Sequence, residues 1–266
     1  MTGTLASPDL REFAEHPGLF LSWAAGGTIT RHLDRRRCIV VGPTFGVVTS
    51  IDVADGELPG LLDEVRELIS PGVRTDWFLG PSMRPESLVA DLLALGLREP
   101  EDGSGTLDAL LIDCEPAGIP AGIETHEVAT MADFTAAAEL RMEAFGLSHE
   151  DREREREALA TYFEEYQHTK DRSNISVVAT VDGRVAGAAS ALLAERGLFL
   201  IGGATAPWAR GQGVYRALVG ARWRYAVARG TPALTVHAMH DTSSPILRRL
   251  GFEEVCKIRH LEGRPT

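Results

Sequence analysis

The apolar and polar positions of the chain follow two different periods, which together predict a mixed α/β protein. Short apolar runs of the strand type alternate with segments whose apolar residues recur every three or four positions, as on one face of a helix. The clearest helical pattern is at residues 58–69, where apolar positions 61, 62, 65 and 68 form one stripe and Pro71-Gly72 ends the segment. We therefore predict layers of sheet and helix.

The same patterns predict the order of elements along the chain. In the first half we expect helices at 8–15, 58–69 and 86–95, and strands at 38–41, 46–53, 77–79 and 107–114. In the second half we expect strands at 123–128, 175–181, 185–193, 198–205, 233–236 and 253–261, with helices at 131–144, within 150–168, before Gly230 and at 244–250. Asp182-Gly183 predicts a hairpin turn between two of these strands.

A glycine loop joins the strand at 198–205 to the helix that ends before Gly230. It reads Arg210-Gly211-Gln212-Gly213, and apolar residues follow at Val214, Leu218, Ala221 and Tyr225. The first turn of a helix has unpaired N–H groups and a positive dipole end, and glycines let a phosphate approach the backbone. The loop lacks the Gly-Lys-Ser/Thr of a Walker loop and the third glycine of a dinucleotide motif, so we expect neither ATP nor NAD.

The loop resembles the acyl-CoA loop of the GCN5-related N-acetyltransferase (GNAT) family, whose pattern is Gln/Arg-x-x-Gly-x-Gly/Ala. The positions from Arg210 to Val214 fit, whereas Tyr215 stands where the family has Gly or Ala. The element order of residues 122–261, the hairpin and Leu250-Gly251-Phe252 also resemble the family. The resemblance implies a mostly antiparallel central sheet, flanked by helices, in which the fourth and fifth strands splay apart.

The resemblance also implies acetyl-CoA as co-substrate, with no metal. Its pantetheine arm would pair with the strand backbone at Gly203, Ala204 and Thr205. Its diphosphate would bind at the glycine loop and the first helical turn, formed by Arg210, Gly211, Gln212, Gly213, Val214, Tyr215 and Arg216. For Arg216 the alternative is an ordinary exposed helix arginine.

A weak internal repeat suggests that the chain holds two GNAT-like domains. Trp77-Phe78-Leu79, a helix and Leu95-Gly96-Leu97 parallel Leu234-Thr235-Val236, a helix and Leu250-Gly251-Phe252. We expect a degenerate domain at 1–115, a Pro/Gly linker at 116–122 and a catalytic domain at 123–266. The first domain has an acidic segment at 51–60 where its loop would lie, and carboxylates repel a diphosphate, so we predict that it binds no CoA.

The reaction implied by the resemblance is direct attack of a neutral amine on the acetyl thioester. Candidate bases are His237, placed at the end of the fifth strand, His240 three residues later, and Glu195 at a hairpin tip. Each histidine has the alternative of a polar cap or a surface residue. Leu247 stands where the family often has a tyrosine acid. Because Tyr215 and Leu247 depart from the family pattern, a CoA-binding pseudo-enzyme or sensing module is the alternative function, and transfer of a longer acyl chain is a third.

The composition limits the classes of molecule that we expect the protein to bind. The net charge is −11, and residues 1–120 hold 19 acidic and 9 basic side chains against 19 and 18 in residues 121–266. This charge argues against nucleic acid and favours a cationic acceptor, so we expect a small amine or an amino-acid-like molecule. Three separated cysteines in apolar runs suggest buried free thiols in a reducing cytoplasm. The apolar stretch at 19–25 is too short to span a membrane. A monomer or a homodimer fits equally.

Overall fold

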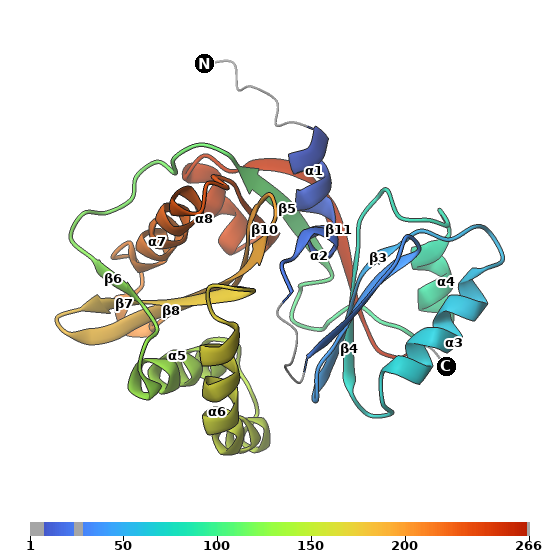
Figure 1. The fold of residues 1–266 in the computed structure, drawn as a ribbon, viewed down its shortest axis with the longest axis horizontal. Coiled ribbons are helices and arrows are strands. Elements are labelled where there is room, and N and C mark those ends of the chain that lie inside the picture. The colour runs from blue at the N-terminus through green and yellow to red at the C-terminus, as the bar shows by residue number, and fades with distance from the viewer. Residues whose placement is uncertain (1–7, 24–28, 265–266) are drawn as a thin grey trace.

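The computed structural model describes residues 8–23 and 29–264, whose strands form one mixed sheet of eleven strands flanked by helices (Figure 1). The strand order is β1-β2-β3-β4-β11-β5-β10-β9-β8-β7-β6. Most neighbours are antiparallel, and the pairs β3–β4 and β9–β10 are parallel. The predicted mixed α/β class is confirmed.

The elements of the first half agree with the predicted types. They are α1 (Pro8–Glu15), α2 (Pro17–Phe20), β1 (Thr30–Leu33), β2 (Arg37–Val41), β3 (Phe45–Ile51), α3 (Leu58–Leu68), β4 (Arg74–Leu79), α4 (Leu88–Ala94) and β5 (Thr106–Ile112). The sequence patterns missed α2 and β1, which are short and carry little periodicity. No helix in the described ranges is long and apolar enough to cross a bilayer, and residues 24 and 25 of the apolar stretch at 19–25 lie outside these ranges.

The second half follows the predicted order closely. Its elements are β6 (Glu124–Glu127), α5 (Met131–Ala144), α6 (His149–Thr169), β7 (Asn174–Val181), β8 (Arg184–Ala194), β9 (Gly197–Thr205), the 3₁₀ turn η1 (Pro207–Ala209), α7 (Val214–Ala228), β10 (Leu234–Met239), α8 (Ser243–Arg249) and β11 (Glu253–Glu262). The hairpin turn is confirmed, with φ of 52° at Asp182 and 73° at Gly183, as a type I′ turn requires. Helices α5 and α6 lie on one side of the β7–β8 hairpin and α7 on the other (Figure 1).

The two halves exchange strands at the centre of the sheet. Strand β5 ends the first half in sequence, yet it lies between β10 and β11, while β11 lies between β4 and β5 (Figure 1). The exchange is reciprocal in the cores as well: Leu110 and Ile112 of β5 belong to the core of the second half, and Leu261 of β11 belongs to the core of the first. The predicted linker at 116–122 therefore does not separate two independent sheets.

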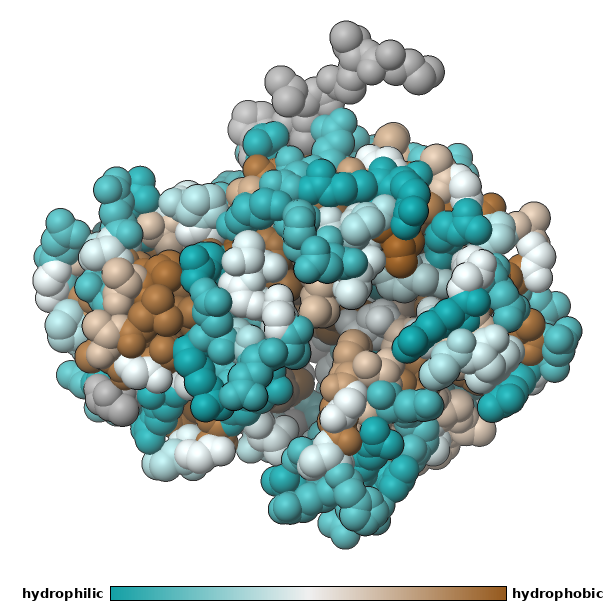
Figure 2. All heavy atoms as spheres, turned by 180° about the vertical axis from the view of Figure 1, so that it is seen from behind, coloured by the Kyte–Doolittle hydropathy of each residue, from teal (hydrophilic) through white to brown (hydrophobic). Residues whose placement is uncertain are grey.

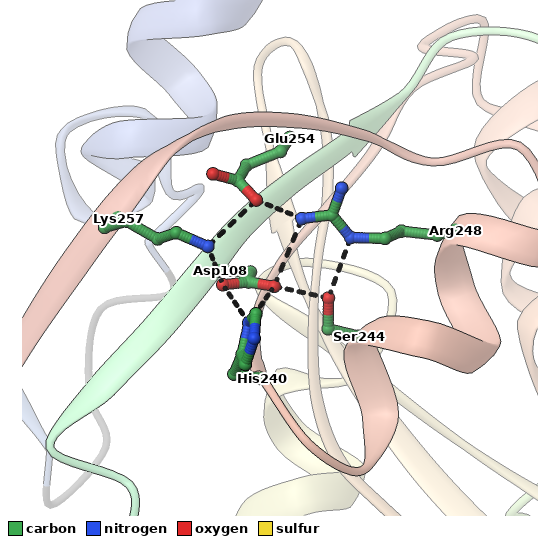
Figure 3. Close-up of polar contacts among 6 residues, drawn as sticks. All are labelled: Asp108, His240, Ser244, Arg248, Glu254 and Lys257. Atoms are coloured by element: carbon green, nitrogen blue, oxygen red, sulfur yellow. Dashed lines mark hydrogen bonds and ion pairs between the residues drawn. The ribbon is translucent and has the colours of Figure 1, made fainter.

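The buried carboxylate of Asp108 links the exchanged strands β5 and β11 (Figure 3). Asp108 of β5 is fully buried and faces groups from three other segments. It accepts hydrogen bonds from Lys257 Nζ of β11 at 2.6 Å, Ser244 Oγ of α8 at 2.5 Å and Arg248 Nη2 of α8 at 3.3 Å, and His240 Nδ1 lies 3.2 Å away. Burial alone would raise the pKa of Asp108, but the hydrogen bonds led by Lys257 and Ser244 hold that pKa well below its ordinary range.

We predict that Asp108→Asn lowers the free energy of unfolding by about 2 kcal/mol at pH 7, because it removes the buried charge that accepts hydrogen bonds from Lys257, Arg248 and Ser244. The folded-state pKa lies below the unfolded one, so this stabilisation is present above the unfolded pKa and is lost as pH falls below about 4. Urea unfolding at pH 7 and pH 3.5 measures both effects. Asp113→Asn, at an exposed position just after the same strand, is the matched control. Equal loss in both variants, or a pH-independent difference, would contradict the assignment.

Candidate functional site

Strands β9 and β10 are paired at one end and separate at the other. Their parallel register covers only Leu198↔Leu234 and Phe199↔Thr235. Beyond that point β9 continues with β8 as far as Thr205, and β10 continues with β5 as far as Met239. The predicted splay of the fourth and fifth strands of this half is confirmed. The facing strand edges are left without a strand partner at residues 200–205 of β9 and 236–239 of β10, which is room for an extended ligand to enter.

A cavity of about 1580 Å³ lies at this opening. It is lined by residues of both halves of the chain and includes all the predicted cofactor-binding residues except Gln212: Gly203, Ala204, Thr205, Arg210, Gly211, Gly213, Val214, Tyr215 and Arg216. Gln212 instead turns back, and its Nε2 donates to the carbonyl of Trp208 at 3.1 Å. The structure thus gathers nearly all of the loop and strand residues around one space.

The glycine loop presents its amides without protein partners. Gly211 and Gly213 have φ of 76° and 92°, the left-handed region that glycine adopts without strain, and helix α7 begins directly after Gly213. Within the described ranges, the backbone N–H groups of residues 211–216 donate to no protein acceptor. A run of free amides at a helix start, next to a cavity, is an arrangement that binds phosphate groups.

The Tyr215 ring fits against strand β9 because Gly203 has no side chain. A Cβ at Gly203 would lie 2.8 Å from Cε2 of the Tyr215 ring, so the ring occupies the space that a side chain on β9 would need. Burial raises the pKa of Tyr215 above its ordinary value, and its hydroxyl stays protonated near neutral pH. The departure from the family pattern therefore keeps a neutral phenol at the edge of the cavity.

Arg222 is a charged residue of this region that sequence reasoning missed. It is 1% exposed, and its Nε and Nη1 donate to the carbonyls of Leu218 and Ser190 at 3.0 Å each. Ser190 adjoins the irregularity in the β8–β9 register, where carbonyl groups lose their strand partners. Nη2 of Arg222 has no partner among the described residues, and burial lowers the pKa of the Arg222 guanidinium to about 10. The signal was available, because residue 222 lies four positions after Leu218 of the apolar stripe and next to Ala221, where an apolar side chain is expected.

His237 lies inside β10 and lines the cavity, so its predicted place at the end of the strand is wrong by two residues. Its Nε2 lies 3.0 Å from the carbonyl of Ala14, which can only accept, so Nε2 carries the hydrogen and Nδ1 is an acceptor without a partner among the described residues. The ring sits between those of Phe78 and Phe199, with centroids 6.0 and 5.2 Å away. Burial lowers the pKa of His237 to about 4, so the imidazole is neutral at pH 7.

The other two candidate bases lie away from the cavity lining. His240 is exposed and turns its Nδ1 towards Asp108. Glu195 is exposed at the tip of the β8–β9 hairpin, where its backbone N–H donates to the carbonyl of Phe20 at 3.0 Å. The structure does not bring the three candidates together, and only His237 borders the opening. No cluster of three potential metal ligands occurs within residues 8–23 and 29–264.

In the first half the backbone of the chain itself bridges the gap next to the parallel strands β3 and β4. Strands β3 and β4 are paired in parallel from Phe45↔Arg74 to Val48↔Trp77. Beyond that point Arg84 takes the place of a ligand: its N–H donates to the carbonyl of Ile51 at 3.2 Å, and its carbonyl accepts from the N–H of Val53 at 3.4 Å. The loop amide of Ala54 is likewise satisfied by the carboxylate of Glu57 at 3.1 Å. These contacts support the prediction that this half binds no CoA.

Comparison with known proteins agrees with this geometry. Residues 134–252 match the model of the acetyltransferase (GNAT) family, so this part of the chain is a GNAT domain. A GCN5-related N-acetyltransferase from Kribbella flavida shares the fold at 16% identity and a TM-score of 0.64, covering 97% of this chain and 96% of that one. No curated protein matches the chain.

Two further solved structures are also similar to both halves of the chain. A tandem GNAT protein from the clavulanic acid biosynthesis pathway is 13% identical with a TM-score of 0.58, covering 100% of this chain and 91% of that one. A functionally unknown conserved protein from Staphylococcus epidermidis ATCC 12228 is 12% identical with a TM-score of 0.62, covering 92% and 96%. The fold of the whole chain is therefore that of a tandem GNAT protein.

We predict that Gly211→Asp weakens acetyl-CoA binding about tenfold or more, because a carboxylate next to the free amides repels the diphosphate. The position is open, with no atom within 4 Å of an added Cβ. Gly211→Asn makes the same demand on the backbone without the charge and is the matched control. Calorimetric titration with acetyl-CoA compares the two variants. Equal affinities would mean that the diphosphate binds elsewhere.

Proposed function

We propose that the chain is an acetyl-CoA-dependent N-acetyltransferase that acetylates the amine of a small molecule or an amino-acid-like acceptor. In this proposal residues 123–266 form the catalytic domain, residues 1–115 form a GNAT-like domain without a CoA site, and residues 116–122 connect them. The observation that carries the proposal is the run of unpartnered amides at residues 211–216 beside the parted strands β9 and β10. The unpartnered amides fit a diphosphate, and the parted strand edges fit the extended pantetheine arm attached to it.

The residues fit the parts of acetyl-CoA in order along the cavity. The amides of residues 211–216 would hold the diphosphate, with Arg210 and Arg216 adding positive charge. The free edge of β9 at Gly203, Ala204 and Thr205 would pair with the pantetheine amides. The thioester would then lie near the point where the strands part, at Phe199 and Thr235.

Acyl transfer at this point requires a neutral amine. Its nitrogen forms a bond to the acetyl carbon, the carbon–sulfur bond breaks, the amine loses a proton and the CoA thiolate gains one. In this proposal His237 takes part through the lone pair of Nδ1, because its ring lines the cavity and its Nε2 is engaged by the carbonyl of Ala14. With a pKa of about 4 it is a weak base, so we assign it the role of hydrogen-bond acceptor that orients the amine.

A CoA-binding module without turnover is the second candidate function. Tyr215 narrows the opening against Gly203, and Leu247, fully buried in α8, stands where an acid would be expected in the family. The Tyr215 departure concerns the predicted CoA site, and the Leu247 departure concerns the chemistry. Turnover therefore separates the two candidates.

We predict that the chain binds one equivalent of acetyl-CoA and releases CoA thiol only when an amine is added. Titration calorimetry gives the stoichiometry, and thiol release over a panel of amines, with mass spectrometry of the products, gives the activity. Two equivalents would show that the opening at Arg84 also binds CoA. Binding without amine-dependent release would favour the sensing module.

We predict that kcat/KM rises with pH as the amine deprotonates and shows no separate inflection near 6.5. The pKa of His237 is lowered to about 4, so its imidazole is already neutral above that pH and is protonated only below it. His237→Gln can keep a donor towards Ala14 and should lower kcat about tenfold without changing the shape of the profile. An inflection near 6.5 that disappears in this variant, or a loss of 10³-fold or more, would show that His237 is a general base.

A further inference from the structure

One wall of the cavity is a sheet face of the first half. Phe45, Val47 and Thr49 alternate along β3, so their side chains share one face, and Val40 of β2 lines the same space. The opposite face of these strands carries Ile39 and Val48, which are fully buried in the core of the first half. The sheet therefore uses one face for its own core and offers the other to the cavity.

The facing wall is also apolar and comes from the second half. Phe145 at the end of α5, Tyr162 of α6 and Phe199 of β9 line it, and Phe78 of β4 borders His237. The space-filling view shows a hollow at the centre of the molecule with apolar side chains around it (Figure 2). The space between the walls is thus bordered largely by aromatic and branched aliphatic groups from both halves.

Charge is distributed unevenly along the cavity. The arginines that line it, at 210, 216, 222 and 249, come from the glycine loop and from helices α7 and α8. Among the described residues, Glu165 of α6 is the one acidic side chain in the lining, and it belongs to the helix that forms the far wall. An anionic ligand is therefore favoured at the loop end, and a cationic or neutral amine with an apolar body is favoured at the other.

We propose that the acceptor is a primary amine carrying an apolar group of about the size of an aryl ring, and that the first half of the chain recognises this group through β2 and β3. The inference rests on the proposed function and specifies the acceptor of the same site. Burying the apolar group contributes about 25 cal/mol per Å² of area removed from water. Polar amines such as ethanolamine lack that gain and would lose hydration on entry.

The same apolar walls assist the chemistry. Removal of an ammonium group from water disfavours its charged form and lowers its pKa. The cavity therefore favours the neutral form of the amine that the reaction needs. A strong base is then not required, which agrees with the low pKa of His237 at the opening. In this arrangement the domain that lacks a CoA site has a role of its own, which is binding the acceptor.

The test uses the full chain loaded with CoA and compares 2-phenylethylamine with ethanolamine in titration calorimetry. We expect 2-phenylethylamine to bind at least tenfold more tightly. Phe45→Ala removes a ring from the wall and should weaken 2-phenylethylamine about tenfold, while Phe45→Leu keeps the wall apolar and should restore most of the affinity. Acetyl-CoA affinity should be the same in the unchanged protein and in both variants, because Phe45 belongs to the cavity wall formed by β2 and β3 and not to the glycine loop.

The outcomes separate this inference from the proposed function. Equal binding of the two amines, or Phe45→Ala leaving 2-phenylethylamine binding unchanged, would overturn the inference even if another amine is acetylated. Equal losses of amine and acetyl-CoA affinity in Phe45→Ala would also overturn it, because they would indicate a general disturbance of the fold. Tight, Phe45-dependent binding of 2-phenylethylamine without thiol release would support the acceptor site and contradict the transferase function.

Discussion

The site depends on a constraint of β-sheets: a strand that leaves its neighbour exposes backbone groups that need another partner. Strand β10 can part from β9 because β5 pairs with its other edge along its whole length. Strand β5 comes from the first half of the chain, and Asp108 joins it to β11 and α8. The opening in the second half is therefore supported by a strand of the first half, and the two halves form one structural unit.

The same constraint explains why the two halves differ. In each, a pair of parallel strands separates and leaves two edges to be satisfied. In the first half the backbone of Arg84 bonds with the freed groups of β3, and Glu57 supplies the negative charge at the loop. In the second half neither substitute is present in the described residues, and the loop amides stay free. A single topology thus gives strand edges bridged by the chain's own backbone in one half and strand edges that border a large cavity in the other.

The sequence predicted the local features well because they are encoded locally. The helix stripe of α3, the Asp182-Gly183 turn and the glycine loop each depend on residues close together in the chain, and all three are present. The splay was expected only through the family resemblance. The exchange of β5 and β11 has no local signal, because Asp108 and Lys257 meet across 149 positions and only the folded sheet places them together.

The candidate site shows the same division. The candidate cofactor-binding residues were proposed because one continuous loop and strand resemble a family motif, whereas the candidate bases were chosen by chain position and, for the histidines, by the usual titration range of imidazole. Position could not show that His240 turns towards Asp108 or that aromatic rings enclose His237. The cavity wall on β3 was also missed, because alternation along a strand shows two faces and does not show what the second face contacts. Burial and partners across the sheet decide these roles.

In the proposed reaction, the weak basicity of His237 limits how the acceptor amine could be activated. An ordinary alkylamine with a pKa near 10 is neutral in about one molecule in a thousand at pH 7, which corresponds to about 4 kcal/mol. An imidazole with a pKa of about 4 cannot take that proton at equilibrium. The environment must then lower the pKa of the amine, and apolar walls do so by disfavouring the ammonium form. In the proposed reaction, the burial that makes His237 a poor base would also raise the fraction of the amine that is neutral, so one property of the cavity would account for both.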